Sequence, residues 1–314
     1  MKSTLIVGQF LAALLALSGC DMLTDSPRPE LREPVAHDIV VEPSARSLEL
    51  AQYYAGVQRG LLTEGLLRTD GGGPDTPFNA RQLAENFSRI ALYDELTFVN
   101  GRYRQQESAS GVRRWTTPVR VAVEFGDAVP LEIRSRDQSN LRSYVNRLRR
   151  VSGAPIDFAR AGEDPNFHVV VLTVDEIEGF EPRLREILPN ISPSLTAQIT
   201  NMPRITYCAV YTFSRAETPN IYDTAVAVIR AEHPNLMRDS CYHEEVAQGL
   251  GLANDSPRAR PSIFNDDSEF AFLTTHDELL LRMLYDTRLT PGMTEASARP
   301  IINDLAREYL GGES

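Results

Sequence analysis

The segment Cys241–Asp255 constrains the fold more than any other, because it joins a helical core pattern to a row of polar side chains. Apolar residues recur there at i, i+4 and i+7, which predicts a buried helix face: Val246, Leu250 and Ala253. Glu244 and Gln248 share the i, i+4 spacing, so a helix places them one turn apart on another face. The segment therefore predicts a helix that carries polar groups beside a core and ends at a glycine.

The same helix resembles the zinc-binding helix of the metzincins, which read HExxHxxGxxH or HExxHxxGxxD. Starting at Glu244, this chain reads E-E-x-x-Q-x-x-G-x-x-N-D, with Glu244 and Gln248 in place of the two helix histidines. The positions in register are the general base, the glycine and the third ligand: Glu245, Gly251 and Asn254, with Asp255 beside it. Two ligand positions one turn apart, with a carboxylate after the first, are typical of a metalloprotease helix.

The resemblance continues downstream in two more blocks. Arg260–Asp266 looks like the metzincin Met-turn, with Phe264 where the methionine would stand, and Thr275–Tyr285 resembles the helix after that turn. The whole chain also resembles an uncharacterised family of bacterial lipoproteins. The resemblance implies an α+β, metzincin- or zincin-like domain with a twisted mixed sheet, an active-site-type helix and a Met-turn-like loop.

The N-terminus predicts export and lipidation. Residues 1–19 read as a lipoprotein signal peptide, with Lys2 before the apolar run Leu5–Leu17. Leu17-Ser18-Gly19-Cys20 resembles a lipobox, which predicts cleavage before Cys20 and a membrane anchor on that cysteine. A plain secretory signal and a transmembrane anchor are the alternatives. By resemblance to enteric sorting rules, Asp21 favours the inner membrane, so we expect a periplasm-facing lipoprotein of the bacterial cell envelope.

Four ranges describe the predicted domain organisation. After the signal peptide 1–19, residues 20–46 hold the lipid anchor and a proline-rich tether, because they lack apolar periodicity. Residues 47–110 are predicted as a helical N-terminal unit and residues 111–314 as the metzincin-like domain.

Hydrophobic periodicity predicts the individual elements. Strands are expected at Val119–Phe125, Asn166–Val174, Ile205–Phe213 and Thr224–Ala231. Further helices are expected at Ser47–Arg68, Asn79–Leu92, Arg136–Val151, Phe180–Ile187 and Thr294–Leu310. Strands that alternate with helices favour an α/β or α+β fold with a twisted sheet.

Charge and cysteine usage narrow the function classes. The formal net charge of −11 argues against a nucleic-acid partner, and the chain has neither a Walker loop nor a G-x-S-x-G elbow. With Cys20 assigned to the lipid, Cys208 and Cys241 remain as a pair, which predicts one disulfide from a strand to the start of the central helix. A thiolate ligand or nucleophile at Cys241 is the alternative.

The polar groups of the helix allow several chemistries. Glu244, Gln248 and either Asn254 or Asp255 would form an oxygen-only set, which suits calcium, magnesium or manganese better than zinc. No cofactor is therefore expected unless such a divalent cation binds. Without metal, Glu245 could act as general base while Gln248 polarises a carbonyl. The simplest alternatives are a polar cleft without catalysis and a solvated helix face; His243 and His168 are expected to be structural.

Three functions remain open. The first is a pseudopeptidase that binds an extended peptide or an envelope protein along the predicted edge strand Ile205–Phe213. The second is an unconventional hydrolase, either metal-assisted or metal-independent, with Glu245 as general base. The third is a purely structural envelope protein.

Overall fold

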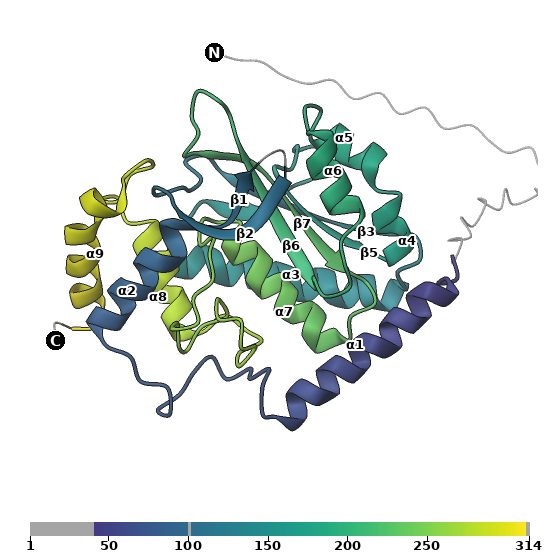
Figure 1. The fold of residues 1–314 in the computed structure, drawn as a ribbon, viewed down its shortest axis with the longest axis horizontal. Coiled ribbons are helices and arrows are strands. Elements are labelled where there is room, and N and C mark those ends of the chain that lie inside the picture. The colour runs from purple at the N-terminus through teal and green to yellow at the C-terminus, as the bar shows by residue number, and fades with distance from the viewer. Residues whose placement is uncertain (1–40, 100–101, 312–314) are drawn as a thin grey trace, which may run out of the picture. The chain divides into compact units, whose positions relative to one another are not determined.

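The structure, a computed structural model, describes residues 41–99 and 102–311, all within the unit Ile39–Ser314 (Figure 1). The predicted signal peptide 1–19, Cys20 and most of the tether 20–46 lie outside the described residues. Among the described helices, none has both the length and the apolar character that a membrane crossing requires.

A mixed sheet of five strands organises this unit, in the order β4-β3-β5-β7-β6. Only β6 runs antiparallel to its neighbour β7, while the other pairs are parallel. The strands are β3 (Val119–Phe125), β4 (Ile156–Phe158), β5 (Phe167–Leu172), β6 (Cys208–Ser214) and β7 (Tyr222–Arg230). The expected α+β class and mixed sheet are thus confirmed, and β3 matches its predicted bounds.

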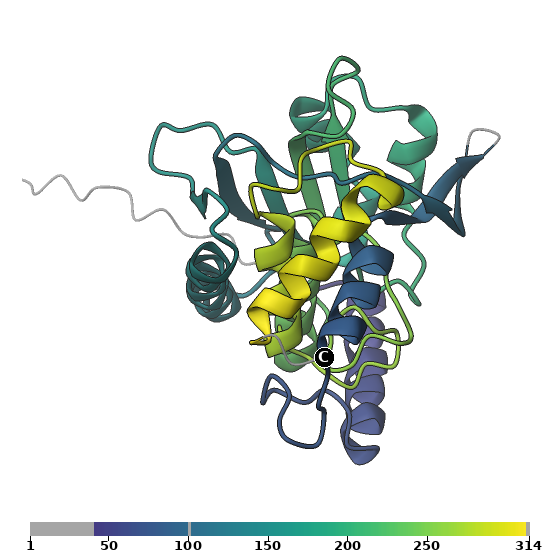
Figure 2. The ribbon, with the colours of Figure 1, turned by 90° about the vertical axis from the view of Figure 1, so that its left-hand side faces the viewer.

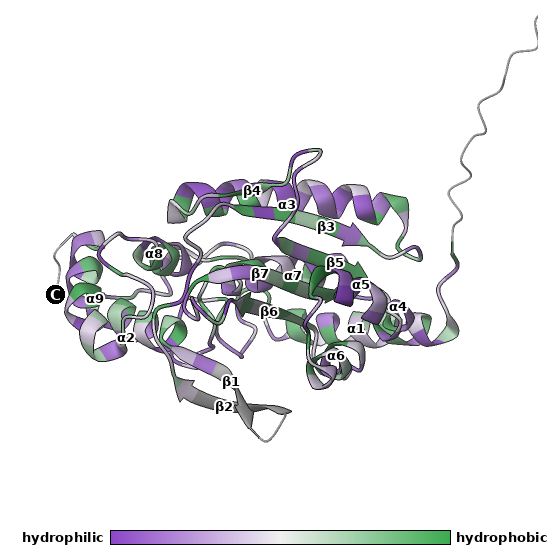
Figure 3. Cartoon of the chain, turned by 90° about the horizontal axis from the view of Figure 1, so that it is seen from above, coloured by the Kyte–Doolittle hydropathy of each residue, from purple (hydrophilic) through white to green (hydrophobic). Residues whose placement is uncertain are grey.

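The sheet is buried on both faces because its central strands, β5 and β7, are mostly apolar and bury residues on both of their sides. Every residue of β5 is buried, and all of them except His168 are apolar. Figure 3 accordingly shows much of this strand as hydrophobic. Val169 and Val171 point into a core with α3 (Leu131–Ser152) and α7 (Asn235–Gln248). Val170 and Leu172 point the other way, into a second core with α4 (Val174–Glu178), α5 (Glu181–Ile187) and α6 (Pro193–Thr200).

The larger core extends beyond the sheet to three more helices: α2 (Ala80–Ala91), α8 (Thr275–Leu284) and α9 (Glu295–Tyr309). Figure 2 shows α9 lying beside α2. By contrast, α1 (Ala45–Thr63) contributes Tyr54 to a separate small cluster with Met237 and Ala271. Contacts therefore group α2 with the C-terminal helices rather than with α1, and residue 110 does not mark a division between compact units.

An antiparallel hairpin lies within residues 47–110, a region that the sequence predicted as helical. Its strands are β1 (Tyr93–Val99) and β2 (Arg102–Ala109). The sequence between them is Asn100-Gly101, which is the dipeptide most typical of a two-residue hairpin loop. The signal for the hairpin was therefore present in the sequence.

The central helix begins earlier than predicted. It starts at Asn235, directly after Pro234, and ends at Gln248. Cys241 therefore lies in the middle of α7, so its predicted place near a helix N-terminus was wrong. The spacing rule located the apolar face around Val246 but could not detect the first turns, whose polar Arg238 and Asp239 are held by tertiary contacts.

The predicted disulfide Cys208–Cys241 is confirmed, with a Cα–Cα distance of 5.9 Å. It joins the first residue of β6 to α7 and closes a sequence separation of 33 residues. A crosslink of this kind typically stabilises a fold by about 2–4 kcal/mol, largely by restricting the unfolded chain. The bond also removes Cys241 from the candidates for a thiolate ligand or nucleophile.

Candidate functional site

The candidate site lies on α7, and a buried charge network fixes the position of that helix. Asp137 on α3 is fully buried and accepts hydrogen bonds from Arg238 and from the hydroxyl of Tyr242, the latter at 2.9 Å. Burial beside this carboxylate raises the pKa of Tyr242, so its phenol stays protonated and donates. These contacts lock α7 against α3 and set the rotation of the helix that presents Glu244 and Glu245.

Two closely confined glycines lie where α7 ends, and one of them, Gly251, turns the chain. Gly251 has a φ of +127°, and a Cβ at this position would lie 2.3 Å from the carbonyl oxygen of Arg113. Gly249 keeps a helical backbone, but a Cβ there would lie 2.5 Å from the ring of Phe167, and its carbonyl accepts a 2.8 Å hydrogen bond from the Trp115 indole. The glycine of the metzincin-like pattern thus stands where only a glycine fits.

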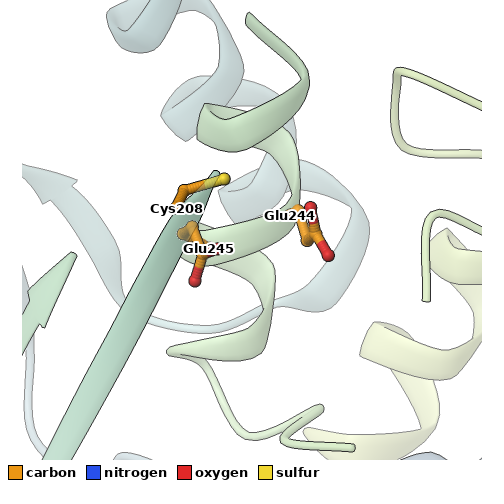
Figure 4. A group of neighbouring side chains, drawn as sticks. All are labelled: Cys208, Glu244 and Glu245. Carbon is orange, nitrogen blue, oxygen red and sulfur yellow. The ribbon is translucent and has the colours of Figure 1, made fainter. Parts of the chain in front are cut away.

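Figure 4 shows three residues at the place where β6 meets α7: Cys208, Glu244 and Glu245. One possible ligand atom from each lies within 4.8 Å of the other two. Because the sulfur of Cys208 is bonded to Cys241, it is not a thiolate and does not act as a metal ligand. The place where β6 meets α7 therefore presents two adjacent carboxylates, Glu244 and Glu245, and we call it the carboxylate corner. The side chain of Glu245 is only 4% exposed.

The remaining predicted site residues fall into two groups. Gln248 and Asp255 are brought together, since the amide nitrogen of Gln248 donates to Asp255 Oδ1 at 3.2 Å. Asn254 is buried, and its side-chain amide donates instead to the carbonyl of Arg89 at 3.0 Å. Its backbone N–H bonds the carbonyl of Ile90, so Asn254 ties the loop after α7 to the end of α2.

The Met-turn-like loop packs under the end of the helix. Phe264 is fully buried in the main core, and its carbonyl accepts a 2.8 Å hydrogen bond from the Ser256 amide. The buried carboxylate of Asp277 on α8 holds the turn by accepting from Ser262 Oγ at 2.6 Å and from the Ile263 amide at 3.0 Å. The turn therefore joins α8 to the loop that follows α7.

The chemical type of the predicted ligand atoms indicates which metal ions they could hold. The predicted ligands offer carboxylate oxygens from Glu244 and Asp255 and an amide oxygen from Gln248. The structure groups Glu244 with Glu245 and Cys208, and it groups Gln248 with Asp255. Oxygen donors fit a hard cation such as calcium, magnesium or manganese and do not fit a catalytic zinc, which prefers imidazole.

His243 and His168, which were expected to be structural, both pack against or hydrogen-bond to neighbouring side chains. His243 stacks between Tyr144 and Phe272 at centroid distances of 3.9 and 4.5 Å, and burial lowers its pKa to about 3. His168 on β5 lies 3.3 Å from Glu124, whose pKa its hydrogen bond helps lower to about 2. Neither ring belongs to the carboxylate corner.

Residues 80–304 match the protein family described as "Protein of unknown function (DUF2927)", so the chain belongs to this family. The matched region begins with α2 and includes the hairpin, the sheet, α7 and the Phe264 turn. No curated protein and no solved structure matches the chain.

Proposed function

We propose that this DUF2927 protein is a lipid-anchored envelope protein whose metzincin-like domain binds an extended peptide or protein segment along β6. The observation that carries the proposal is the seven-residue edge strand β6, which begins at the carboxylate corner of α7. In this proposal the domain is a pseudopeptidase that keeps a peptide-binding edge without a zinc-binding triad.

The two edges of the sheet differ in their capacity for strand addition. β4 has only three residues, which limits pairing with another chain. β6 has seven, all half-buried, and within the described residues its only sheet partner is β7. An extended peptide can pair with such an edge through backbone hydrogen bonds, while side-chain pockets provide specificity.

The charge near β6 favours one class of peptide. Glu244 and Glu245 lie beside Cys208, the first residue of the strand, and the whole chain has a formal net charge of −11. Complementary charge steers association and fixes the register of a bound segment. We therefore expect the preferred segments to carry lysine or arginine at the end that pairs near Cys208.

The order of elements further supports the metzincin-like assignment. An antiparallel edge strand and β7 are followed by α7, the Gly251 turn, the buried Phe264 turn and α8. This is the order that the sequence resemblance implies. The replacement of both helix histidines by Glu244 and Gln248 is the reason to favour binding over zinc-dependent hydrolysis.

Hydrolysis is the second candidate function, and the shielded carboxyl of Glu245 is the observation that favours it. A carboxylate 4% exposed next to a peptide-binding edge is placed to take a proton from water. Glu244, Gln248 and Asp255 would hold a divalent cation if one assists, which would supply Lewis-acid chemistry at the bound carbonyl.

The protein is expected to bind basic ten-residue peptides from a random library without cleaving them. Methylating alternate backbone nitrogens of a bound peptide should weaken binding at least about tenfold, because strand pairing loses its N–H donors while the side chains stay the same. Fluorescence anisotropy measures the affinity and mass spectrometry detects cleavage. Glu245→Gln is the matched variant, since it keeps the shape of the side chain and removes its charge.

The peptide experiments distinguish the pseudopeptidase from the hydrolase. Cleavage by the natural protein that disappears in Glu245→Gln would establish the hydrolase and overturn the pseudopeptidase. An absence of binding across the library, or equal affinity for methylated and unmethylated peptides, would exclude pairing with β6.

Replacing Cys20 by serine is expected to move the protein from the membrane fraction to the soluble fraction, because the acyl chains that anchor it would be lost. Immunoblotting of the two fractions measures the shift, and mass spectrometry of the natural N-terminus should show an acylated cysteine. Cys208→Ser in the same cells is the control, since it removes a cysteine without affecting the lipobox. A Cys20→Ser protein that stays fully membrane-bound would contradict the anchor.

A further inference from the structure

A cavity of about 450 Å³ lies between α3 and α7, away from the carboxylate corner. Four rings contribute to its wall: Tyr144, Tyr242, His243 and Phe272. His243 and Glu245 are two residues apart on α7, so their side chains point about 200° apart around the helix. The volume is within the usual range of about 300–1,000 Å³ for small-molecule sites.

Most polar groups on the wall are already used by the protein. Asp239 accepts hydrogen bonds from Arg136 and Asn140. Arg147 donates to Glu278 at 2.7 Å and to the carbonyl of Leu273 at 2.9 Å. These contacts neutralise Asp239, which is the one acidic side chain of the cavity wall, and Arg147, which is one of its two arginines. A ligand would therefore find its polar partners among the other wall residues.

His243 supplies one such group, and the structure fixes its tautomer. The Leu273 amide donates to Nδ1 of His243 at 2.9 Å, so Nδ1 is unprotonated. An imidazole whose Nδ1 accepts a hydrogen bond carries its proton on Nε2. Within the described part of the chain this Nε2–H has no hydrogen-bond acceptor, which leaves a donor on a residue of the cavity wall.

Arg150 supplies the second group. It is exposed at the end of α3, and among residues 41–99 and 102–311 its guanidinium forms neither an ion pair nor a hydrogen bond. Its neighbour Arg149 differs, because it pairs with Asp157 at 2.8 Å. The cavity thus offers a positive charge and an N–H donor beside aromatic walls, and no uncommitted carboxylate.

We propose that this cavity binds a small organic monoanion with a flat apolar body, such as an aromatic carboxylate. The carboxylate accepts hydrogen bonds from Arg150 and from His243 Nε2–H, and the apolar body packs on Tyr144, Phe272 and Tyr242. The site is separate from β6, so it does not depend on the proposed peptide binding.

Naphthalene-2-carboxylate and its neutral analogue naphthalene-2-carboxamide test the proposal on the intact protein. Isothermal titration calorimetry is expected to show at least about tenfold tighter binding of the carboxylate, because only the anion forms a charge-assisted bond with Arg150. Arg150→Gln should remove this preference and leave carboxamide binding unchanged. Arg150→Lys should restore part of it, since the charge returns without the planar fork.

Arg149→Gln is the matched control, because it removes an adjacent arginine whose partner Asp157 lies outside the cavity wall. It should leave both affinities unchanged. The proposal is overturned if neither probe binds at millimolar concentration, if the carboxamide binds as tightly as the carboxylate, or if Arg149→Gln weakens binding as much as Arg150→Gln.

Discussion

Gly251→Ala is expected to destabilise the fold by about 2–6 kcal/mol, which combines a strained backbone conformation with overpacking. The φ of Gly251 is +127°, and an added Cβ would lie 2.3 Å from the carbonyl oxygen of Arg113. A backbone oxygen cannot move aside as the end of a flexible side chain can. The chain would have to shift where α7 leads into the loop that carries Asn254 and Asp255.

Gly60→Ala is the matched control. Gly60 lies inside α1, and a Cβ there meets no atom within 4 Å. Alanine should stabilise the helix by about 0.5–1 kcal/mol, because glycine loses more backbone freedom on folding. Urea denaturation followed by circular dichroism measures both variants. If the two alanine variants were equally stable, Gly251 would not be confined as the structure indicates.

The strands that could be predicted are those whose burial produces a recognisable hydrophobic pattern in the sequence. β5 is buried at every position and reads as an apolar run in which His168 is the one polar residue. β4 has only three residues and, in the part of the chain that the structure describes, pairs only with β3, so no periodicity can develop along it. The hairpin has a different kind of local signal, since β1 and β2 are separated in the sequence by the turn-forming dipeptide Asn100-Gly101.

The candidate site could be predicted only as far as local spacing reaches. The pattern from Glu244 to Asp255 correctly indicated a helix that ends before a confined glycine. The start of α7 depends on Arg238 and on Asp137, which are 101 residues apart in sequence. The aromatic stack on His243 likewise comes from α3 and from the segment before α8, so only tertiary packing reveals the cavity.

Asp137→Ala is expected to destabilise the protein by about 3–5 kcal/mol, because it leaves a buried charge without its partner. Asp137 and Arg238 are 0% and 1% exposed, and the Tyr242 hydroxyl loses its acceptor in the same variant. Chemical denaturation measures the free energy of unfolding. Asp157→Ala should cost less than about 1 kcal/mol, since its ion pair with Arg149 is exposed.

The double variant Asp137→Leu with Arg238→Met distinguishes loss of the ion pair from general damage to the interface between α3 and α7. Replacing both charges by apolar side chains of similar size removes the unpaired cation, and such replacements are often neutral or stabilising. We expect the double variant to recover at least about half of the stability that Asp137→Ala loses. If instead the double variant were the less stable of the two, the Tyr242 contact and the packing of Asp137, rather than the buried Arg238 charge, would hold α7 in the orientation that presents Glu244 and Glu245.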